Sequence, residues 1–233
     1  MVTTDDILLK RNRLVKRTTD LFLSIIILVP LIPILIVISL ICYLIMGSPV
    51  FYYSRRFITS ERQITIIKFR SMVKNAVSEK YKLNQRYMQN GFLNIPLSDE
   101  IYTPFGRILE LTQLVESPQI FLVLSGYLSL VGNRPLPMAN RDLIKESFPH
   151  LWEKRFEAPA GITGIAQVVG KYDLSAEQRL YLESLYAQVF RRGNIFKADM
   201  IICWYTFTRL VLRGKKYTLD FKNAETFLKN CLN

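Results

Sequence analysis

The sequence predicts an α/β fold, rich in helix, with a re-entrant N-terminal membrane helix hairpin and a small membrane-surface domain carrying amphipathic interfacial helices. Two observations predict it. From Leu21 to Met46 no residue is charged, a run longer than the stretch of about 20 apolar residues that spans a bilayer as a helix. The remainder alternates short β-branched or aromatic runs with helical patterns. We expect three parts: residues 1–47 with the membrane helix, a cytosolic domain at 48–194, and an interfacial helix with a basic tail at 195–233.

Basic residues flank the apolar run on both sides, with Lys16 and Arg17 before it and Arg56 after it. Because positive flanks prefer the cytoplasmic face, both ends favour the same side, and a straight span satisfies only one of them. Pro30 and Pro33 lack amide hydrogens, so a helix break or bend is expected there. We therefore predict a helix that enters and leaves on the cytoplasmic side. An ordinary proline-kinked spanning helix is the alternative that the residues leave open.

The charge balance suits an anionic partner. Lys and Arg number 31 against 19 Asp and Glu, a formal net charge of +12. Because the basic residues bracket an apolar block, membrane lipids are favoured over nucleic acid. Cys42, Cys203 and Cys231 have no metal-ligand spacing, and His150 is the single histidine. A disulfide framework, a zinc site and a histidine-based triad are therefore not expected.

The rest of the chain divides into short elements. Strands are expected at 50–53 and 64–72, and helices at 73–91, 107–113, 174–190 and 195–212. The first strand also fits an interfacial aromatic belt. The last helix ends in basic residues, which fits an interfacial helix on anionic lipid, and a core helix with a solvated tail fits as well.

Six short motifs occur in a specific order. They are Lys16-Arg17-x-x-Asp20-x-x-x-Ser24, Gly47-Ser48-Pro49-Val50-Phe51-Tyr52, Lys68-Phe69-Arg70-Ser71-Met72, Leu114-Val115-Glu116-Ser117-Pro118-Gln119, Leu128-Ser129-Leu130-Val131-Gly132-Asn133-Arg134-Pro135 and Gly161-Ile162-Thr163-Gly164-Ile165-Ala166-Gln167. Together they resemble the bacterial sugar transferase family over most of the chain. The resemblance implies transfer of a sugar-1-phosphate from a nucleotide sugar to a polyprenyl phosphate, the step that starts many cell-surface glycans. It also implies a place at the cytosolic face of the bacterial inner membrane.

The resemblance also assigns site residues. In the family an Asp-Glu pair precedes Pro-Gln, where the Asp attacks the phosphate and the Glu helps to place Mg²⁺. Here Glu116 is the retained catalytic and metal residue, while Val115 stands at the position of the nucleophile and Glu110 at the position of an arginine. The implied substrate-binding residues are Lys68, Arg70, Gln119, Arg134 and Gln167.

A hydrocarbon side chain has no lone pair with which to attack phosphorus, so Val115 cannot perform the covalent step. We therefore favour a non-catalytic member that binds lipid, nucleotide sugar or a partner, as a homo-oligomer or with an active homologue. The alternative is an active phosphoglycosyl transferase, with Mg²⁺, in which Glu116 or the polyprenyl phosphate itself attacks. A third interpretation is a fold kept for assembly alone, without nucleotide-sugar affinity.

Overall fold

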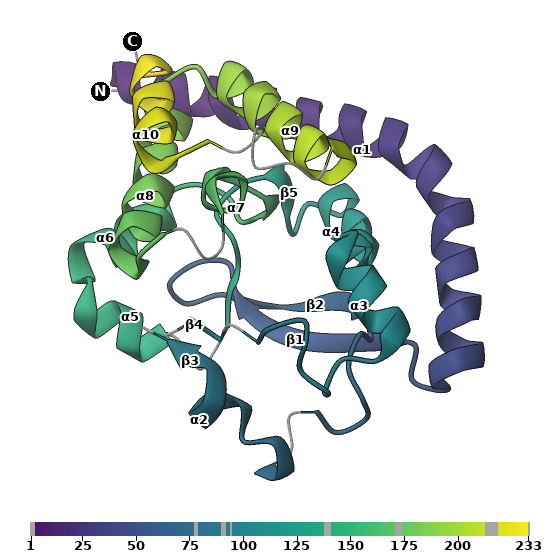
Figure 1. The fold of residues 1–233 in the computed structure, drawn as a ribbon. Helices are drawn as coiled ribbons and strands as arrows, with labels where there is room; N and C mark the ends of the chain where they lie inside the picture. Colours follow the sequence, from purple (N-terminus) through teal and green to yellow (C-terminus); the bar gives the residue numbers. More distant parts are fainter. Residues whose placement is uncertain are drawn as a thin grey trace.

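The computed structural model describes residues 3–76, 79–89, 92–93, 95–137, 141–170, 174–212 and 219–232. One long helix, α1 (Thr4–Met46), lies along the outside of a folded body of short strands and helices (Figure 1). The strands are β1 (Phe51–Phe57), β2 (Gln63–Phe69), β3 (Met88–Gln89), β4 (Phe92–Leu93), β5 (Ser129–Val131), β6 (Leu136–Pro137) and β7 (Gly161–Thr163). The other helices are η1 (Glu79–Tyr81), α2 (Leu83–Tyr87), α3 (Pro104–Leu111), η2 (Leu114–Gln119), α4 (Ile120–Leu124), α5 (Arg141–Ser147), α6 (Pro149–Arg155), α7 (Ile165–Val169), α8 (Ala176–Arg192), α9 (Ile195–Leu212) and α10 (Phe221–Asn230).

Helix α1 is continuous but bent. Its N-terminus is fixed by a capping box between Thr3 and Asp6, and Pro30 and Pro33 lie inside it. Figure 1 shows the helix running along one edge of the body and then turning down another. Proline is the usual cause of such a kink, because it removes a backbone hydrogen bond. The predicted bend is confirmed, although the chain stays helical through both prolines; we call residues 4–29 the first arm and residues 34–46 the second arm.

The first arm is held to the body by polar contacts. Its buried residues at every fourth position are Asn12, Lys16, Asp20 and Ser24. Asn12 donates two hydrogen bonds, each 2.9 Å, to backbone carbonyls at and just after the end of α8. Lys16 pairs with Asp199 of α9 at 2.7 Å. Asp20 accepts a hydrogen bond of 2.6 Å from Ser129 and another of 3.1 Å from the next amide in β5. Because these groups would be costly to bury unpaired, the first arm belongs to the fold of the body.

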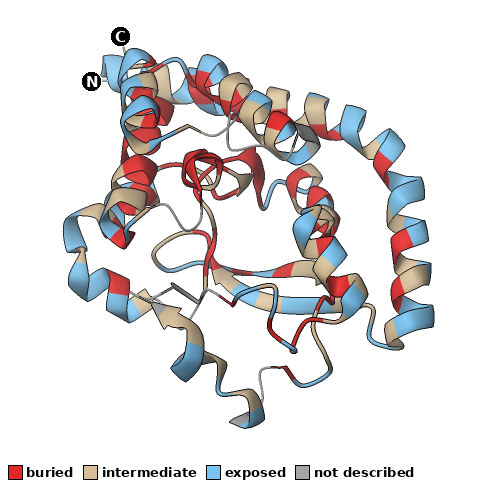
Figure 2. Cartoon of the chain, viewed as in Figure 1, coloured by how far each residue is buried: buried red, intermediate tan, exposed pale blue. Residues whose placement is uncertain are grey.

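The second arm packs through apolar side chains and leaves most of its surface uncovered. Ile38 and Cys42 are buried against the body, while the remaining face is exposed, as Figure 2 shows. Its large exposed side chains are Ile34, Ile36, Val37, Leu40, Tyr43, Leu44 and Ile45. Within the described residues, α1 is the one helix long and apolar enough to cross a membrane.

Three small sheets support the rest. β2, β1 and β6 form an antiparallel sheet in that order, β3 pairs with β4, and β5 runs parallel to β7. The β5–β7 contact needs glycine, since a Cβ on Gly132 would lie 2.4 Å from the carbonyl oxygen of Pro159. The described helices α7 to α10 share one hydrophobic cluster with β5.

The sequence predicted several of these elements. The expected strand at 64–72 is β2, the expected helices at 174–190 and 195–212 are α8 and α9, and the aromatic run at 50–53 opens β1. The helix expected over 73–91 is wrong. Asn75 and Lys82 adopt positive φ angles of 58° and 43°, which end helical structure, so the described part of this stretch forms two short helices, η1 and α2, followed by strand β3.

Candidate functional site

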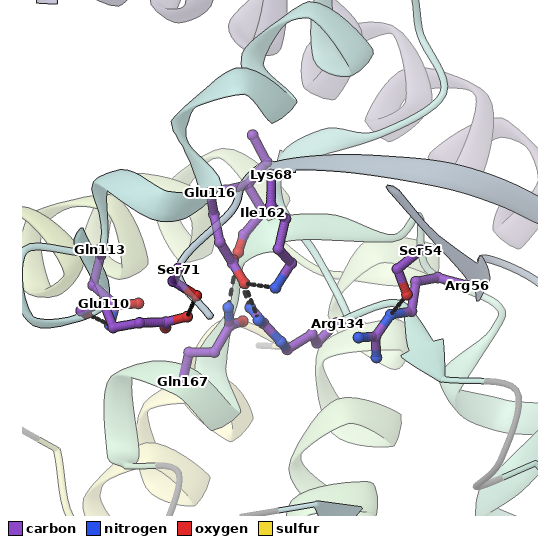
Figure 3. Close-up of polar contacts among 10 residues, drawn as sticks. All are labelled: Ser54, Arg56, Lys68, Ser71, Glu110, Gln113, Glu116, Arg134, Ile162 and Gln167. Atoms are coloured by element: carbon purple, nitrogen blue, oxygen red, sulfur yellow. Dashed lines mark hydrogen bonds and ion pairs between the residues drawn. The ribbon is translucent and has the colours of Figure 1, made fainter. Parts of the chain in front are cut away.

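A buried carboxylate bound by two cations lies where η2 packs against β2. Glu116 is 8% exposed. Its Oε1 accepts a hydrogen bond of 2.6 Å from Lys68 Nζ on β2. Arg134, which follows β5, binds both carboxylate oxygens, with Nη1 at 3.0 Å from Oε2 and Nη2 against Oε1. Figure 3 shows the three side chains converging, and we call Lys68, Glu116 and Arg134 the Glu116 cluster.

The charges in this cluster stabilise one another. Burial alone would raise the pKa of Glu116, but the positive charges of Arg134 and Lys68 outweigh it and hold that pKa far below its usual value. The pKa of Arg134 is raised, chiefly by the charge of Glu116. The carboxylate is therefore ionised throughout the physiological range, with each oxygen already accepting a hydrogen bond from a cation.

The backbone of Arg134 is held by its neighbours. The amide of Gly132 donates to the carbonyl of Thr163 at 2.8 Å, which ties the end of β5 to β7. Arg155 donates to the backbone carbonyl of Arg134 at 2.8 Å and pairs with Glu183 of α8 at 2.6 Å. Arg155 and Glu183 are both buried. The guanidinium group that binds Glu116 is thus carried by a rigid segment.

Val115 lies in different surroundings from its neighbour Glu116. It is 2% exposed and packs in a hydrophobic cluster that we call the Val115 cluster. The buried members of this cluster are Ile38, Cys42, Phe69, Leu109 and Val115. Ile38 and Cys42 of the second arm of α1 belong to the same cluster, so the position that the resemblance assigns to a nucleophile lies in apolar surroundings.

Comparison with known proteins decides the family. Residues 11–213 match the bacterial sugar transferase family. The chain belongs to the bacterial sugar transferase family. It is 29% identical over 218 residues to an undecaprenyl-phosphate galactose phosphotransferase of Salmonella typhimurium, covering 88% of this chain and 42% of that protein.

Two further relatives cover different shares of their own length. A UDP-glucose:undecaprenyl-phosphate glucose-1-phosphate transferase of Escherichia coli is 34% identical over 159 residues, which are 68% of this chain and 32% of that protein. The uncharacterized sugar transferase EpsL of Bacillus subtilis is 33% identical over 182 residues, 78% of this chain and 79% of that protein. This chain therefore spans less than half the length of the first two relatives.

The other predicted substrate-binding residues of this family member lie outside the hydrogen-bonded cluster. Arg70 follows the end of β2 and donates to the carbonyls of Met46 and Gly47, so it caps the end of α1. Gln167 in α7 donates to the carbonyl of Ile162 at 2.8 Å. Gln119 is buried at the end of η2. The structure thus joins Lys68, Glu116 and Arg134 and gives Arg70 a bond to the membrane helix.

Glu110, at the position of a family arginine, accepts a hydrogen bond of 2.8 Å from Ser71. Its negative charge also raises the pKa of Arg134, after the larger influence of Glu116. The replacement therefore adds an anion to the surroundings of the Glu116 cluster instead of a further cation.

Several residues that build the site were missed by sequence reasoning. Arg56 was noted only as a basic residue flanking the membrane helix, yet it lies on β1 near Arg134. Arg155 and Glu183 were not noted at all. Their pairing joins positions 28 residues apart, and no local pattern signals such a contact.

The residues present do not make a magnesium site. Mg²⁺ is usually held by one or two carboxylates together with substrate phosphates. Glu116 has both oxygens engaged by cations, and no group of three or more His, Cys, Asp or Glu side chains gathers among the described residues. A divalent cation would have to replace Lys68 and Arg134 at this carboxylate. We therefore expect Mg²⁺ only in the alternative in which the protein is an active enzyme.

Proposed function

We propose that this bacterial sugar transferase family member is non-catalytic and acts as a membrane-associated binding or partner subunit in the initiation of cell-surface glycan or exopolysaccharide synthesis. One observation carries the proposal. The side chain at the presumed nucleophile position is a valine buried in the Val115 cluster, and the neighbouring carboxylate is held by two cations.

Both features act against phosphoryl transfer. A covalent step needs an anionic or activated nucleophile in line with the leaving nucleotide, and Val115 supplies none. Glu116 has a carboxylate, but hydrogen bonds from Lys68 and Arg134 lower its basicity and nucleophilicity. Attack by Glu116 would first require both ion pairs to break.

The ligands we propose are a nucleotide sugar and polyprenyl phosphate. The relative from Salmonella typhimurium is an undecaprenyl-phosphate galactose phosphotransferase, and the one from Escherichia coli is a UDP-glucose:undecaprenyl-phosphate glucose-1-phosphate transferase. In this chain, Lys68 and Arg134 supply the cationic groups that suit a phosphate. A fold kept for assembly alone would lack such affinity, so nucleotide-sugar binding separates the two interpretations.

We further propose that α1 is re-entrant and that the body lies at the cytosolic face of the bacterial inner membrane. Both arms of α1 pack against the same body, the first through Lys16 and Asp199 and the second through Ile38. On α9, Trp204 and Phe207 are exposed, which suits contact with the lipid interface. Because basic residues lie on both sides of the apolar run, one face of the membrane satisfies both.

Single-cysteine labelling tests this topology. Arg13→Cys and Glu61→Cys place thiols at exposed positions before and after the membrane segment. In intact cells, an impermeant maleimide should label neither, and both should react after the inner membrane is opened. The parent chain, with Cys42 and Cys231 buried and Cys203 partly buried, gives the background of labelling at native cysteines. Labelling of one position from outside would establish a spanning helix instead.

The activity itself is tested with purified protein, Mg²⁺, polyprenyl phosphate and a panel of nucleotide sugars, measuring release of nucleoside monophosphate. We expect no turnover above a protein-free control. Turnover that disappears in Glu116→Ala would establish the alternative, an active enzyme with a rearranged site. Turnover that persists in Glu116→Ala would point to direct attack by the polyprenyl phosphate.

The partner role needs a separate measurement. Affinity purification from native membranes, followed by crosslinking, should recover a second copy of this chain or an active homologue of the same family. Recovery of the chain only as a monomer would contradict the partner role, and the proposed ligand-binding role would still stand.

A further inference from the structure

Arg56 is a cation whose charge is poorly balanced. It lies on β1, in register with Pro137 of β6, and is partly buried. Its Nε donates to the hydroxyl of Ser54 at 3.1 Å. Burial, and next the like charge of Arg134, lower the pKa of Arg56 to about 10. Glu116 acts in the opposite direction, but its carboxylate is bound to Lys68 and Arg134.

Together these side chains leave a surplus of positive charge. Arg56, Lys68 and Arg134 carry three positive charges, and Glu116 carries one negative charge, so two remain unbalanced within this group. In Figure 3, Arg134 lies between Glu116 and Arg56, with its guanidinium group turned toward Glu116. An anion that bound between Arg134 and Arg56 would therefore meet two cations.

We propose that Arg56 is an anion-binding residue of this site. The Glu116 carboxylate occupies the anion position at Arg134, and a phosphate-bearing ligand displaces it from Arg134 on binding. This inference rests on the proposed binding function. Carboxylate and phosphate both match the two-pronged geometry of a guanidinium group, so they compete for the same face of Arg134. A phosphate with two negative charges also matches the two positive charges that remain after the charge of Glu116 is counted.

The competition between Glu116 and phosphate predicts the direction in which the phosphate affinity changes. A carboxylate tethered next to its cation acts at an effective concentration in the millimolar range or above, so it weakens every ligand that needs the same cation. Removing the charge of Glu116 should therefore strengthen phosphate binding. A glutamate that holds a metal for the substrate would have the opposite effect, because its loss would weaken binding.

The experiment measures binding of inorganic pyrophosphate to the full chain in detergent by calorimetry, with EDTA present so that metal ions do not contribute. Glu116→Gln keeps the shape of the side chain and removes its charge. We expect it to raise the affinity about tenfold or more. Adding Arg56→Gln to Glu116→Gln should reverse most of that gain.

Two variants serve as controls. Glu61→Gln removes one negative charge from the exposed turn between β1 and β2 and should leave the affinity unchanged. Glu116→Asp keeps the charge on a shorter side chain, so its affinity should lie between those of the parent and Glu116→Gln. If Glu116→Gln fails to fold, Glu116→Asp still tests whether the carboxylate competes with pyrophosphate.

An unchanged or weaker affinity in Glu116→Gln, or an equal gain in Glu61→Gln, would refute the displacement of a resident anion. An undiminished gain in the double variant would refute the role of Arg56. These failures leave the proposed non-catalytic function standing, since that is decided by nucleoside monophosphate release. Conversely, turnover by the parent chain would overturn the proposed function without affecting the sign of the pyrophosphate result.

Discussion

Two pairs of adjacent residues have opposite environments. On β2, Lys68 contacts Glu116, while the next residue, Phe69, packs in the Val115 cluster with the neighbour of Glu116. Successive side chains of a strand point to opposite faces, so one step along β2 separates an ionic site from a hydrophobic one. The adjacent residues Val115 and Glu116 of η2 divide in the same way. The difference teaches that the position assigned to the nucleophile is closed by apolar packing as well as by chemistry, because Val115 is buried in a cluster that includes Ile38 of the second arm.

This comparison also bears on repair of the site. Replacing Val115 by aspartate would not simply restore a reactive group, since the new carboxylate would enter the Val115 cluster beside Ile38 and Phe69.

The largest expected effect comes from that substitution. Val115→Asp should lower the free energy of unfolding by about 4 kcal/mol or more, because burial without a partner raises a carboxyl pKa by several units. With the folded-state pKa above the unfolded value, the loss should grow as pH rises and shrink as pH falls. Denaturant unfolding in detergent at pH 5 and pH 8 measures both. Val115→Asn, of similar shape but uncharged, should show no such additional pH dependence.

A smaller loss should follow from opening the same cluster on the membrane side. Ile38→Ala should cost about 2–4 kcal/mol, the usual effect of truncating a buried aliphatic side chain. Val37→Ala, an exposed neighbour, provides the comparison and should change stability little in detergent. Equal effects at the two positions would show that Ile38 does not pack in the Val115 cluster in solution.

On the ionic side, Arg134→Gln should cost about 1–3 kcal/mol, because Glu116 keeps Lys68 but loses its bidentate partner. The value is moderate since the Arg134 side chain is 33% exposed and partly screened by water. Arg55→Gln, an exposed arginine of β1, should be neutral. A loss as large as that of Val115→Asp would mean that the two sides do not differ.

The smallest expected effect is an absence of change. Because Arg134 and Lys68 keep the pKa of Glu116 far below its usual range, lowering the pH from 7 to 5 should not protonate it. The pyrophosphate affinity of the parent chain should therefore stay below that of Glu116→Gln at both pH values. Protonation of pyrophosphate itself affects both proteins equally, so the ratio of the two affinities removes it. A rise toward the affinity of that variant would show that the carboxylate is only weakly held.

The sequence predicted the long apolar helix, the first two strands, helices α8 and α9, and the three residues of the Glu116 cluster. It did so because apolar runs and short motifs are local signals, and because the family resemblance supplied Lys68, Glu116 and Arg134. It could not predict that Arg70 caps α1 or that Arg56 lies near Arg134. Those contacts depend on where β2 ends and on pairing between β1 and β6, which no spacing encodes.

The polar stripe of the first arm has a consequence for biogenesis. Lys16 and Asp20 leave the ribosome early, whereas Asp199 and Ser129, which satisfy them, are made more than a hundred residues later. Until then these charges sit beside a segment that is already able to enter lipid. Insertion of the apolar run and folding of the body are therefore coupled in time, and a foreign membrane anchor grafted in place of residues 4–29 would leave Asp199 buried without its cation.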